Sequence, residues 1–165
     1  MQSDCLFLHN HHLSFNALET MNVQRPGKLE VRRLAPLEWR DAYPVIAQLR
    51  TLDEAEFLAR VRRQSHSGYE LAAAFLDGKM IGVLGMRPVH TLARGAHLHV
   101  DDLVVDAAVR GSGAGRSLME FAENDARARG MTAVFLDARP DAVPFYERAD
   151  YRLHPAPSMK KVLEA

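Results

Sequence analysis

A strand, a glycine-rich turn and a helix follow one another without interruption between residues 97 and 130 of this chain. Gly111, Gly113 and Gly115 lie within five residues, and glycine permits positive φ and lets a ligand approach the backbone closely. Apolar residues then recur at helical spacing over 118–126, so we expect a helix to start inside the turn. The rest of the chain must fold around this succession of elements.

The turn is suited to binding a phosphate. The first backbone N–H groups of a helix have no partner within the helix, and the helix dipole adds partial positive charge there. Phosphate groups favour such positions. Arg110 and Arg116 flank the turn and add positive charge for a polyanion. We therefore expect a phosphate-bearing ligand at residues 110–116.

Two common nucleotide-binding motifs fit this turn poorly. A Walker A loop ends in Gly-Lys-Ser/Thr, whereas Gly115 is followed by Arg116 and Ser117 after a different spacing. The dinucleotide fingerprint Gly-x-Gly-x-x-Gly opens a βαβ unit, whereas Gly-x-Gly-x-Gly lies two thirds of the way along this chain. A nucleoside triphosphatase is therefore disfavoured, and a nucleotide-binding regulator stays as a minor alternative.

The residues around the turn resemble a different family. Leu-x-Val-Asp, starting at Leu103, precedes Arg-x-x-Gly-x-Gly at residues 110–115, and Phe145-Tyr146-Glu147-Arg148 follows later in the chain. This combination resembles the GNAT superfamily of N-acetyltransferases, whose glycine turn binds the pyrophosphate of acetyl-coenzyme A. The resemblance covers roughly residues 28–163. It implies acetyl-coenzyme A as co-substrate, bound by Leu103, Val104, Val105, Arg110, Gly111, Ser112, Gly113, Ala114, Gly115 and Arg116.

Length and composition indicate one globular domain. The chain has 165 residues, of which 47% are hydrophobic and 25% charged. Lysine plus arginine equals aspartate plus glutamate at 21 each, so neither nucleic acid nor an anionic membrane is an expected partner. A single cysteine and the lack of a long apolar run predict a cytoplasmic protein without a disulfide framework or membrane helix. The sequence leaves open whether the chain forms a homodimer.

Residues 1–27 show no clear periodicity and are predicted to form a mobile N-terminal extension, with a single acetyltransferase domain over 28–165. The extension lacks the positive charge and apolar run of a secretory signal. It contains His9, His11 and His12. The last two are adjacent and would point apart, so no metal site is predicted.

The predicted fold class is α/β, with a mixed, mostly antiparallel central sheet, a parallel pair formed by the fourth and fifth strands, and flanking helices. Asp77-Gly78 between two apolar runs predicts a hairpin. Gly82 and Gly85 inside its second strand indicate a bulge or a close backbone neighbour. The expected strands are 29–34, 69–76, 80–86, 97–105 and 132–136, with closing strands at 151–153 and 159–163. The expected helices are one from Pro36 with a kink or break at Pro44, one over 52–61, the long helix after the turn, and one over 141–149. A loop is expected over 88–95.

Acetyl transfer requires a base, an acid and an oxyanion donor. An alkyl ammonium with a pKa near 10.4 must lose a proton before it attacks a thioester, and a thiolate with a pKa near 8.5 must leave. The carbonyl oxygen gains charge as the carbon becomes tetrahedral. The resemblance assigns the oxyanion donor to the backbone N–H of Leu103. It also implies that residues 103–105 pair with the pantetheine arm as an added strand does.

The fourth strand carries the candidate bases. Alternation puts His97, His99 and Asp101 on one face and Asp102 on the other. The resemblance directs His99 and Asp101 toward the acceptor, which makes them the predicted catalytic pair. A bulge would reverse the faces and so keeps Asp102 as an alternative. A structural interpretation, with His99 bonded to backbone and the aspartates solvating a strand end, also stays open.

Tyr146 is the predicted acid. It lies in the segment that resembles the family's helix bearing a tyrosine near the coenzyme sulfur, and a phenol with a pKa near 10 can protonate a departing thiolate. The alternative is a core aromatic with a locally bonded hydroxyl. Two positions depart from the family pattern. Arg139 stands where an asparagine often contacts the coenzyme, and Asp150 stands where glycine usually ends the tyrosine helix.

The sequence thus predicts an N-acetyltransferase that moves an acetyl group to a primary amine by direct attack in a ternary complex, since no core cysteine is available for an acyl enzyme. A small-molecule or peptide amine is the expected acceptor. The main alternative is a non-catalytic domain that binds or senses acyl-coenzyme A. No charge pattern in the sequence selects one acceptor.

Overall fold

The computed structural model describes residues 27–156 and 158–163. The predictions for residues 1–26, including the histidine cluster and the mobile extension, lie outside this part. The strands are β1 (Leu29–Arg33), β2 (Glu70–Leu76), β3 (Lys79–Thr91), β4 (Gly95–Val105) and β5 (Val134–Leu136). The α-helices are α1 (Tyr43–Ile46), α2 (Glu54–Ser65), α3 (Ala114–Ala128) and α4 (Val143–Glu147), and two 3-10 helices are η1 (Pro36–Ala42) and η2 (Ala107–Val109).

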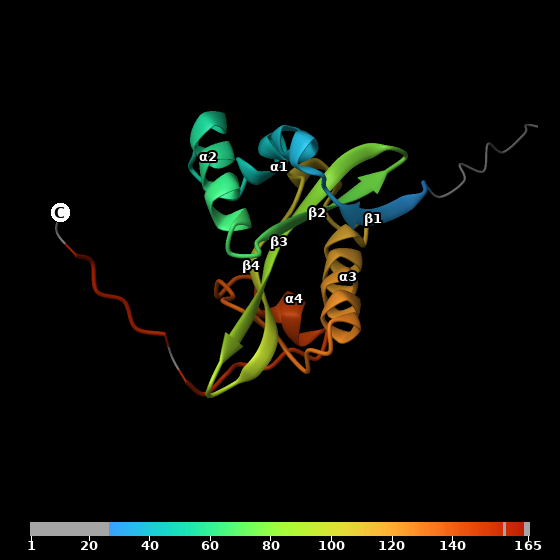
Figure 1. The fold of residues 1–165 in the computed structure, drawn as a ribbon. Coiled ribbons are helices and arrows are strands. Elements are labelled where there is room, and N and C mark those ends of the chain that lie inside the picture. Colours follow the sequence, from blue (N-terminus) through green and yellow to red (C-terminus); the bar gives the residue numbers. More distant parts are fainter. Residues whose placement is uncertain (1–26, 157, 164–165) are drawn as a thin grey trace, which may run out of the picture.

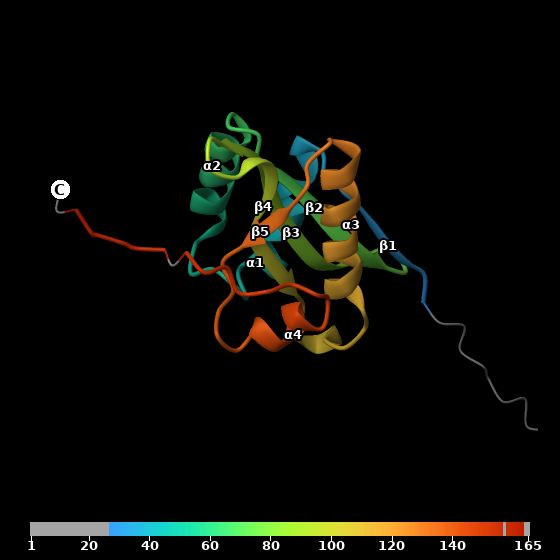
Figure 2. The same ribbon diagram turned by 90° about the horizontal axis from the view of Figure 1, so that it is seen from below.

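The strands form one mixed sheet in the order β1-β2-β3-β4-β5. The first three pairings are antiparallel, and β4 pairs with β5 in parallel, which confirms the predicted fold class. Helices α1 and α2 cover one face of the sheet, and α3 and α4 cover the other (Figures 1 and 2). The glycine turn between β4 and α3 therefore carries the chain from the sheet onto the face that α3 covers.

Each face of the sheet has its own core. On the α3 face, Leu98 and Leu118 are fully buried. On the α2 face, Phe57, Val83 and Val104 are buried together. Burying one such side chain stabilises a fold by about 1.5–3 kcal/mol. Side chains on the two faces of the strands thus form two hydrophobic cores, and β4 lies between them.

The predicted hairpin at Asp77-Gly78 is confirmed between β2 and β3. Both residues have positive φ, 50° for Asp77 and 81° for Gly78, as the tight turns of hairpins require. The Asp77 carboxylate also accepts a hydrogen bond from the Lys28 backbone N–H at 2.9 Å. Near the kink or break predicted at Pro44, the chain passes from η1, which ends at Ala42, to α1, and Pro44 lies in the first turn of α1.

The loop predicted over residues 88–95 is wrong. Strand β3 continues through Pro88 to Thr91 and pairs with β4, which begins at Gly95. Pairing with β2 ends at Met86, so within the described part of the chain Pro88 has a strand, β4, on one side alone. Edge positions are where strands accommodate proline, because the missing N–H leaves no central ladder bond unmade.

The closing strands predicted over 151–153 and 159–163 are also wrong. The described residues after α4 belong to no strand, and residues 158–163 run away from the body of the protein (Figure 1). Leu153 and Met159 are 76% and 97% exposed. Without burial, nothing offsets the entropy lost when a segment becomes a strand. Asp150 does adopt the left-handed conformation expected after the tyrosine helix, with φ of 63°.

Candidate active site

Hydrogen bonds fix the path of the chain from β4 into the glycine turn. The Asp106 backbone N–H donates to the Ile81 carbonyl at 2.8 Å. Its carboxylate accepts from the Ala108 N–H at 3.0 Å, and this bond lowers the pKa of Asp106 below its ordinary value. The Gln48 side-chain oxygen accepts from the Ala107 N–H at 3.0 Å. The start of the turn is therefore tied both to β3 and to the segment after α1.

The turn depends on glycine for two different reasons. Gly111 and Gly113 have φ of 86° and 87°, and a Cβ at either would meet no atom within 4 Å, so backbone conformation alone requires glycine there. Gly113 is the N-cap of α3. At Gly115 a Cβ would lie 3.3 Å from the Phe145 ring, so α4 packs tightly against the first turn of α3.

The first turn of α3 has the features expected of a phosphate site. The N–H groups at its start have no acceptor within the helix, and the helix dipole favours an anion there. Within residues 27–156 and 158–163, neither Arg110 nor Arg116 forms an ion pair. Both guanidinium groups are therefore available to a polyanion, and the residues present fit the pyrophosphate of a coenzyme.

Strand β5 is much shorter than β4. Their pairing covers Leu98 to Val100 on β4 and ends at Leu136 on β5, while β4 continues to Val105. Among the residues that the structure describes, no strand pairs with this side of β4 beyond Val100. An extended ligand arm would find free backbone groups there, as an added strand does.

A bulge in β4 changes which side chains share a face. Leu103 pairs with Leu84 and Asp102 with Gly85, but Met86 pairs with Val100, so Asp101 is the extra residue. The bulge reverses the alternation. The prediction that Asp102 lies opposite His99 is therefore wrong, because both face the side covered by α2.

A cavity of about 500 Å³ lies between β4 and α2 on that side. His99, Asp101 and Asp102 line it together with Asp137, which follows β5. The other lining residues are a mixture of apolar, aromatic, basic and amide side chains. The remaining lining residues are Ile46, Arg50, Leu52, Phe57, Arg60, Val61, Gln64, Tyr69 and Val100.

Asp101 and His99 lie close to one another in this cavity. Asp101 accepts hydrogen bonds from Arg87 at 2.8 and 3.3 Å, and its Oδ1 lies 3.7 Å from His99 Nε2. His97 has a different environment. It is 2% exposed, and its ring contacts the edge of Phe135 at a centroid distance of 4.8 Å, which makes it a core residue.

Asp102 is held from both sides. Tyr69 Oη donates to its Oδ2 and Arg50 Nε donates to its Oδ1, each at 2.7 Å. Burial, and then the charge of Asp102, raises the pKa of Tyr69 well above its ordinary value. The Tyr69 hydroxyl therefore stays protonated and remains a hydrogen-bond donor.

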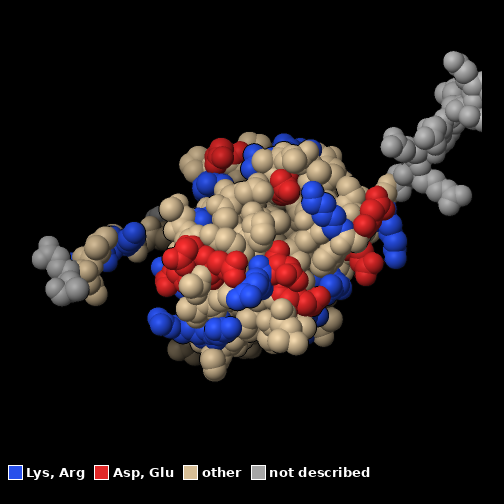
Figure 3. Space-filling model, turned by 90° about the horizontal axis from the view of Figure 1, so that it is seen from above, with Lys and Arg blue, Asp and Glu red and all other residues tan. Residues whose placement is uncertain are grey.

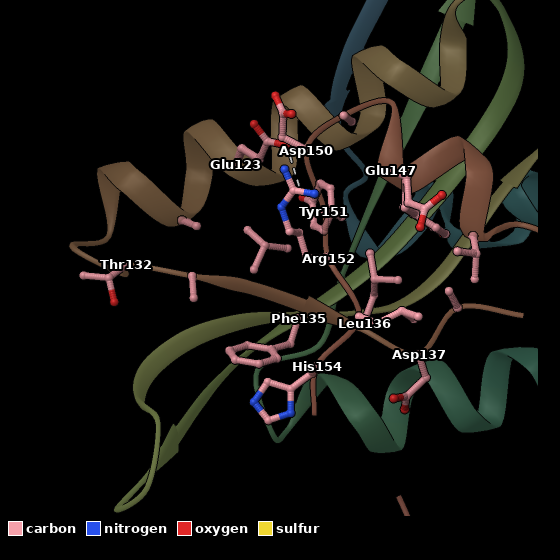
Figure 4. Close-up of a pocket in the computed structure, with 18 of the residues that line it drawn as sticks. Glu123, Thr132, Phe135, Leu136, Asp137, Glu147, Asp150, Tyr151, Arg152 and His154 are labelled. Carbon is pink, nitrogen blue, oxygen red and sulfur yellow. Dashed lines mark hydrogen bonds between the residues drawn. The ribbon is translucent and has the colours of Figure 1, made fainter. Parts of the chain in front are cut away.

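Tyr146 lies on α4 beside a second cavity, of about 810 Å³, between β5, α3 and α4. Figure 4 shows this cavity, where Tyr151 donates a hydrogen bond to Glu123. The Tyr146 ring packs edge-on against the Phe145 ring, with 5.0 Å between the ring centroids. Burial raises the pKa of Tyr146, and the nearby charge of Arg139 partly opposes this rise.

The predicted site residues thus fall into three groups. His99 and Asp101 share the smaller cavity, Tyr146 lines the larger one, and residues 103–105 and 110–116 form the path from β4 to α3. Asp137 lines both cavities. The sequence did not reveal the roles of Arg50, Tyr69, Arg87 and Asp137. For Tyr69 the sequence contained one signal, Gly85, because a glycine inside a strand indicates a close neighbour.

Acidic and basic side chains alternate over the face shown in Figure 3, without a broad patch of one sign. In the part of the chain that the structure describes, no helix is long and apolar enough to span a membrane.

Comparison with known proteins identifies relatives of this chain and solved structures with a similar fold. Residues 31–151 match the sequence model described as "Acetyltransferase (GNAT) family". YhdJ of Bacillus subtilis, an uncharacterized N-acetyltransferase, is 33% identical over 66% of this chain and 80% of its own length. A glucosamine 6-phosphate N-acetyltransferase of Trypanosoma brucei brucei is 34% identical over 47% of this chain and 54% of its own length. The crystal structure of a Trypanosoma brucei acetyltransferase has a TM-score of 0.69 at 24% identity, covering 82% of this chain and 100% of that one.

Proposed function

Because the chain belongs to the acetyltransferase (GNAT) family and is an acetyltransferase, we propose that it transfers an acetyl group from acetyl-coenzyme A to a primary amine by direct attack. One observation carries this proposal. The same strand, β4, leads at one end into the glycine turn of α3 and carries in its middle His99, Asp101 and Asp102 of the smaller cavity. A ligand bound at the turn and extended along β4 would bring its reactive end to that cavity.

The coenzyme would be held mainly by backbone groups. N–H groups between Arg110 and Arg116 would bind the pyrophosphate, and the two arginines would add charge. Backbone groups of Leu103 to Val105 would pair with the pantetheine arm. When bound, acetyl-coenzyme A supplies the thioester whose carbonyl carbon the amine attacks.

His99 or Asp101 is the proposed base. The acceptor's ammonium group loses its proton to this base, directly or through a water molecule. The nitrogen lone pair then forms the C–N bond, and the nitrogen releases its second proton to solvent as the tetrahedral intermediate collapses to the amide. The Leu103 N–H stabilises the charge that develops on the carbonyl oxygen.

Tyr146 is the proposed acid. As the C–S bond breaks, the electron pair goes to sulfur, and the Tyr146 hydroxyl gives it a proton. The raised pKa of Tyr146 keeps this proton in place at neutral pH.

An acceptor that combines an amine with an anionic group suits the smaller cavity. Asp101, Asp102 and Asp137 would attract an ammonium group, and Arg60 on α2, whose Nε donates to Glu56 at 2.6 Å, could turn its remaining N–H groups to an anion. The Trypanosoma relative is named for glucosamine 6-phosphate, which has both groups, although the match spans about half of that protein's length. We therefore propose glucosamine 6-phosphate as the first acceptor to test.

The experiment is a screen of primary amines with acetyl-coenzyme A, followed by thiol release and by mass spectrometry of the product. It includes glucosamine and glucosamine 6-phosphate as a pair that differs in the phosphate alone. Acetylated product with a stoichiometric thiol signal supports the proposal. If coenzyme A binds tightly but no amine in the screen is acetylated, the non-catalytic binding or sensing domain becomes the better account.

A further inference from the structure

Asp102 presents an oriented carboxylate to the smaller cavity. Tyr69 Oη and Arg50 Nε each donate to a different carboxylate oxygen at 2.7 Å. Arg50 also donates to the Asp101 carbonyl at 3.0 Å, which fixes the guanidinium itself. Each carboxylate oxygen has a second lone pair, so Asp102 can still accept a hydrogen bond from a ligand in the cavity.

Tyr69 reaches Asp102 through a gap that glycine leaves. Tyr69 is 4% exposed, and a Cβ at Gly85 would lie 1.9 Å from its hydroxyl oxygen. Gly85 is also the residue that pairs with Asp102 across β3 and β4. The hydroxyl therefore occupies the place of the missing side chain, directly beside the carboxylate that the bulge at Asp101 turns toward the cavity.

Other charged and titratable groups surround the same cavity. They are His99 and Asp101 on β4, Asp137 after β5, Arg60 on α2, and Arg87 on β3, which pairs with Asp101. Asp102 differs from the other two aspartates because its partners come from the segments before β2 and after α1. Its position is thus set by the packing of those segments and not by its own strand alone.

We propose that Tyr69 is a positioning residue for the acceptor amine, holding Asp102 so that this carboxylate binds the acceptor's ammonium group. The inference rests on the proposed acetyl transfer. A carboxylate already held in place binds an ammonium without first losing conformational freedom. The hydroxyl remains a donor throughout the neutral pH range, because its burial disfavours the phenolate.

Replacing Tyr69 by Phe tests this proposal, because the ring is kept and the hydroxyl bond is lost. A hydrogen bond to a charged group typically contributes enough to change affinity by about tenfold or more. We expect Tyr69→Phe to raise the KM for the amine by that factor, and to leave the KM for acetyl-coenzyme A and kcat nearly unchanged. Tyr43→Phe is the matched control. It removes a tyrosine hydroxyl that bonds the Leu52 carbonyl at 3.0 Å, and its amine KM should stay at the wild-type value.

A double-mutant cycle with Asp102→Asn separates positioning from a general loss of structure. If Tyr69 acts through Asp102, Tyr69→Phe raises the amine KM in the wild-type background but adds little in the Asp102→Asn background. Equal effects in both backgrounds, or an unchanged amine KM in active Tyr69→Phe, overturn the inference and leave the acetyl transfer intact. A wild-type protein that acetylates no amine overturns both.

Discussion

Gly113→Ala tests whether the backbone conformation of the glycine turn is needed for binding the coenzyme. Gly113 has φ of 87° and caps α3, and an added Cβ would meet nothing within 4 Å. The substitution therefore introduces no clash and costs free energy through the left-handed conformation alone, about 1–2 kcal/mol. The turn relieves this strain by rotating φ toward negative values, which tilts the N–H groups that would face the pyrophosphate.

The matched control for Gly113→Ala is Gly130→Ala, at the other end of the same helix. Gly130 has φ of 71°, and its added Cβ would also lie in open space. Both variants should lose similar stability, and each kcal/mol should lower Tm by about 2–4 °C. Calorimetric titration with coenzyme A should give a Kd raised about tenfold or more for Gly113→Ala, since 1.4 kcal/mol corresponds to one factor of ten. The Kd of Gly130→Ala should match wild type.

The reasoning is refuted by either of two results. Unchanged affinity in Gly113→Ala would mean that the turn does not bind the coenzyme. An equal loss in Gly130→Ala would mean that affinity reports the general stability of α3.

Three further predictions concern the proposed acid and two ion-pair sites. Tyr146→Phe should lower kcat by about a hundredfold or more and hardly change the Kd for coenzyme A. In the wild type, ionisation of Tyr146 should cause no loss of kcat below about pH 10, because the pKa of Tyr146 is raised above its ordinary value. An unchanged kcat in steady-state assays would remove Tyr146 from the mechanism. Asp125→Asn should lower the free energy of unfolding by about 1–3 kcal/mol, measured by urea denaturation, because the Asp125 carboxylate pairs with Arg33 and, at 2.9 Å, with Arg129; a loss within error would assign those pairs to solvent-screened contacts. Hydrogen bonds from Arg32 and from the Ala35 N–H lower the pKa of Glu38 to about 2, so its contribution to stability is present above the unfolded-state pKa of about 4.3 and is lost as the pH falls toward 2. The Tm of wild type and Glu38→Gln should therefore differ at pH 7 and converge near pH 2, and a constant difference would contradict this linkage.

The parts of the fold that depend on local chemistry could be predicted from the sequence. Asp77-Gly78 specifies its hairpin because both residues tolerate positive φ. Gly113 and the helical pattern after it specify the start of α3 for a similar reason. Asp150 is a third local case. It stands where the family usually has glycine, so a left-handed residue was expected there, and its φ is 63°.

The parts that depend on contacts between distant segments could not be predicted. The bulge at Asp101 arises from the register of β4 against β3. This register turned Asp102 to the face that alternation had given to His97, His99 and Asp101. The bond between Tyr69 and Asp102 joins residues 33 positions apart. Gly85 indicated a close neighbour, but a glycine does not say which side chain fills its place.

The strand predicted at residues 159–163 shows a different limit. A segment with Met159, Val162 and Leu163 has strand-forming composition, yet these side chains stay exposed in the structure. Strand propensity reflects the fit of a side chain to a half-buried sheet surface more than an intrinsic backbone preference. Sequence composition therefore overstates strand formation wherever no neighbouring strand provides that surface.

The most direct test of the whole account is a crystal structure of the protein with coenzyme A. The account predicts pyrophosphate oxygens about 2.7–3.2 Å from backbone nitrogens between Arg110 and Arg116, with the pantetheine arm along Leu103 to Val105 and the sulfur near Tyr146. A pyrophosphate bound at any other place, or an arm that does not run beside β4 beyond Val100, would contradict it.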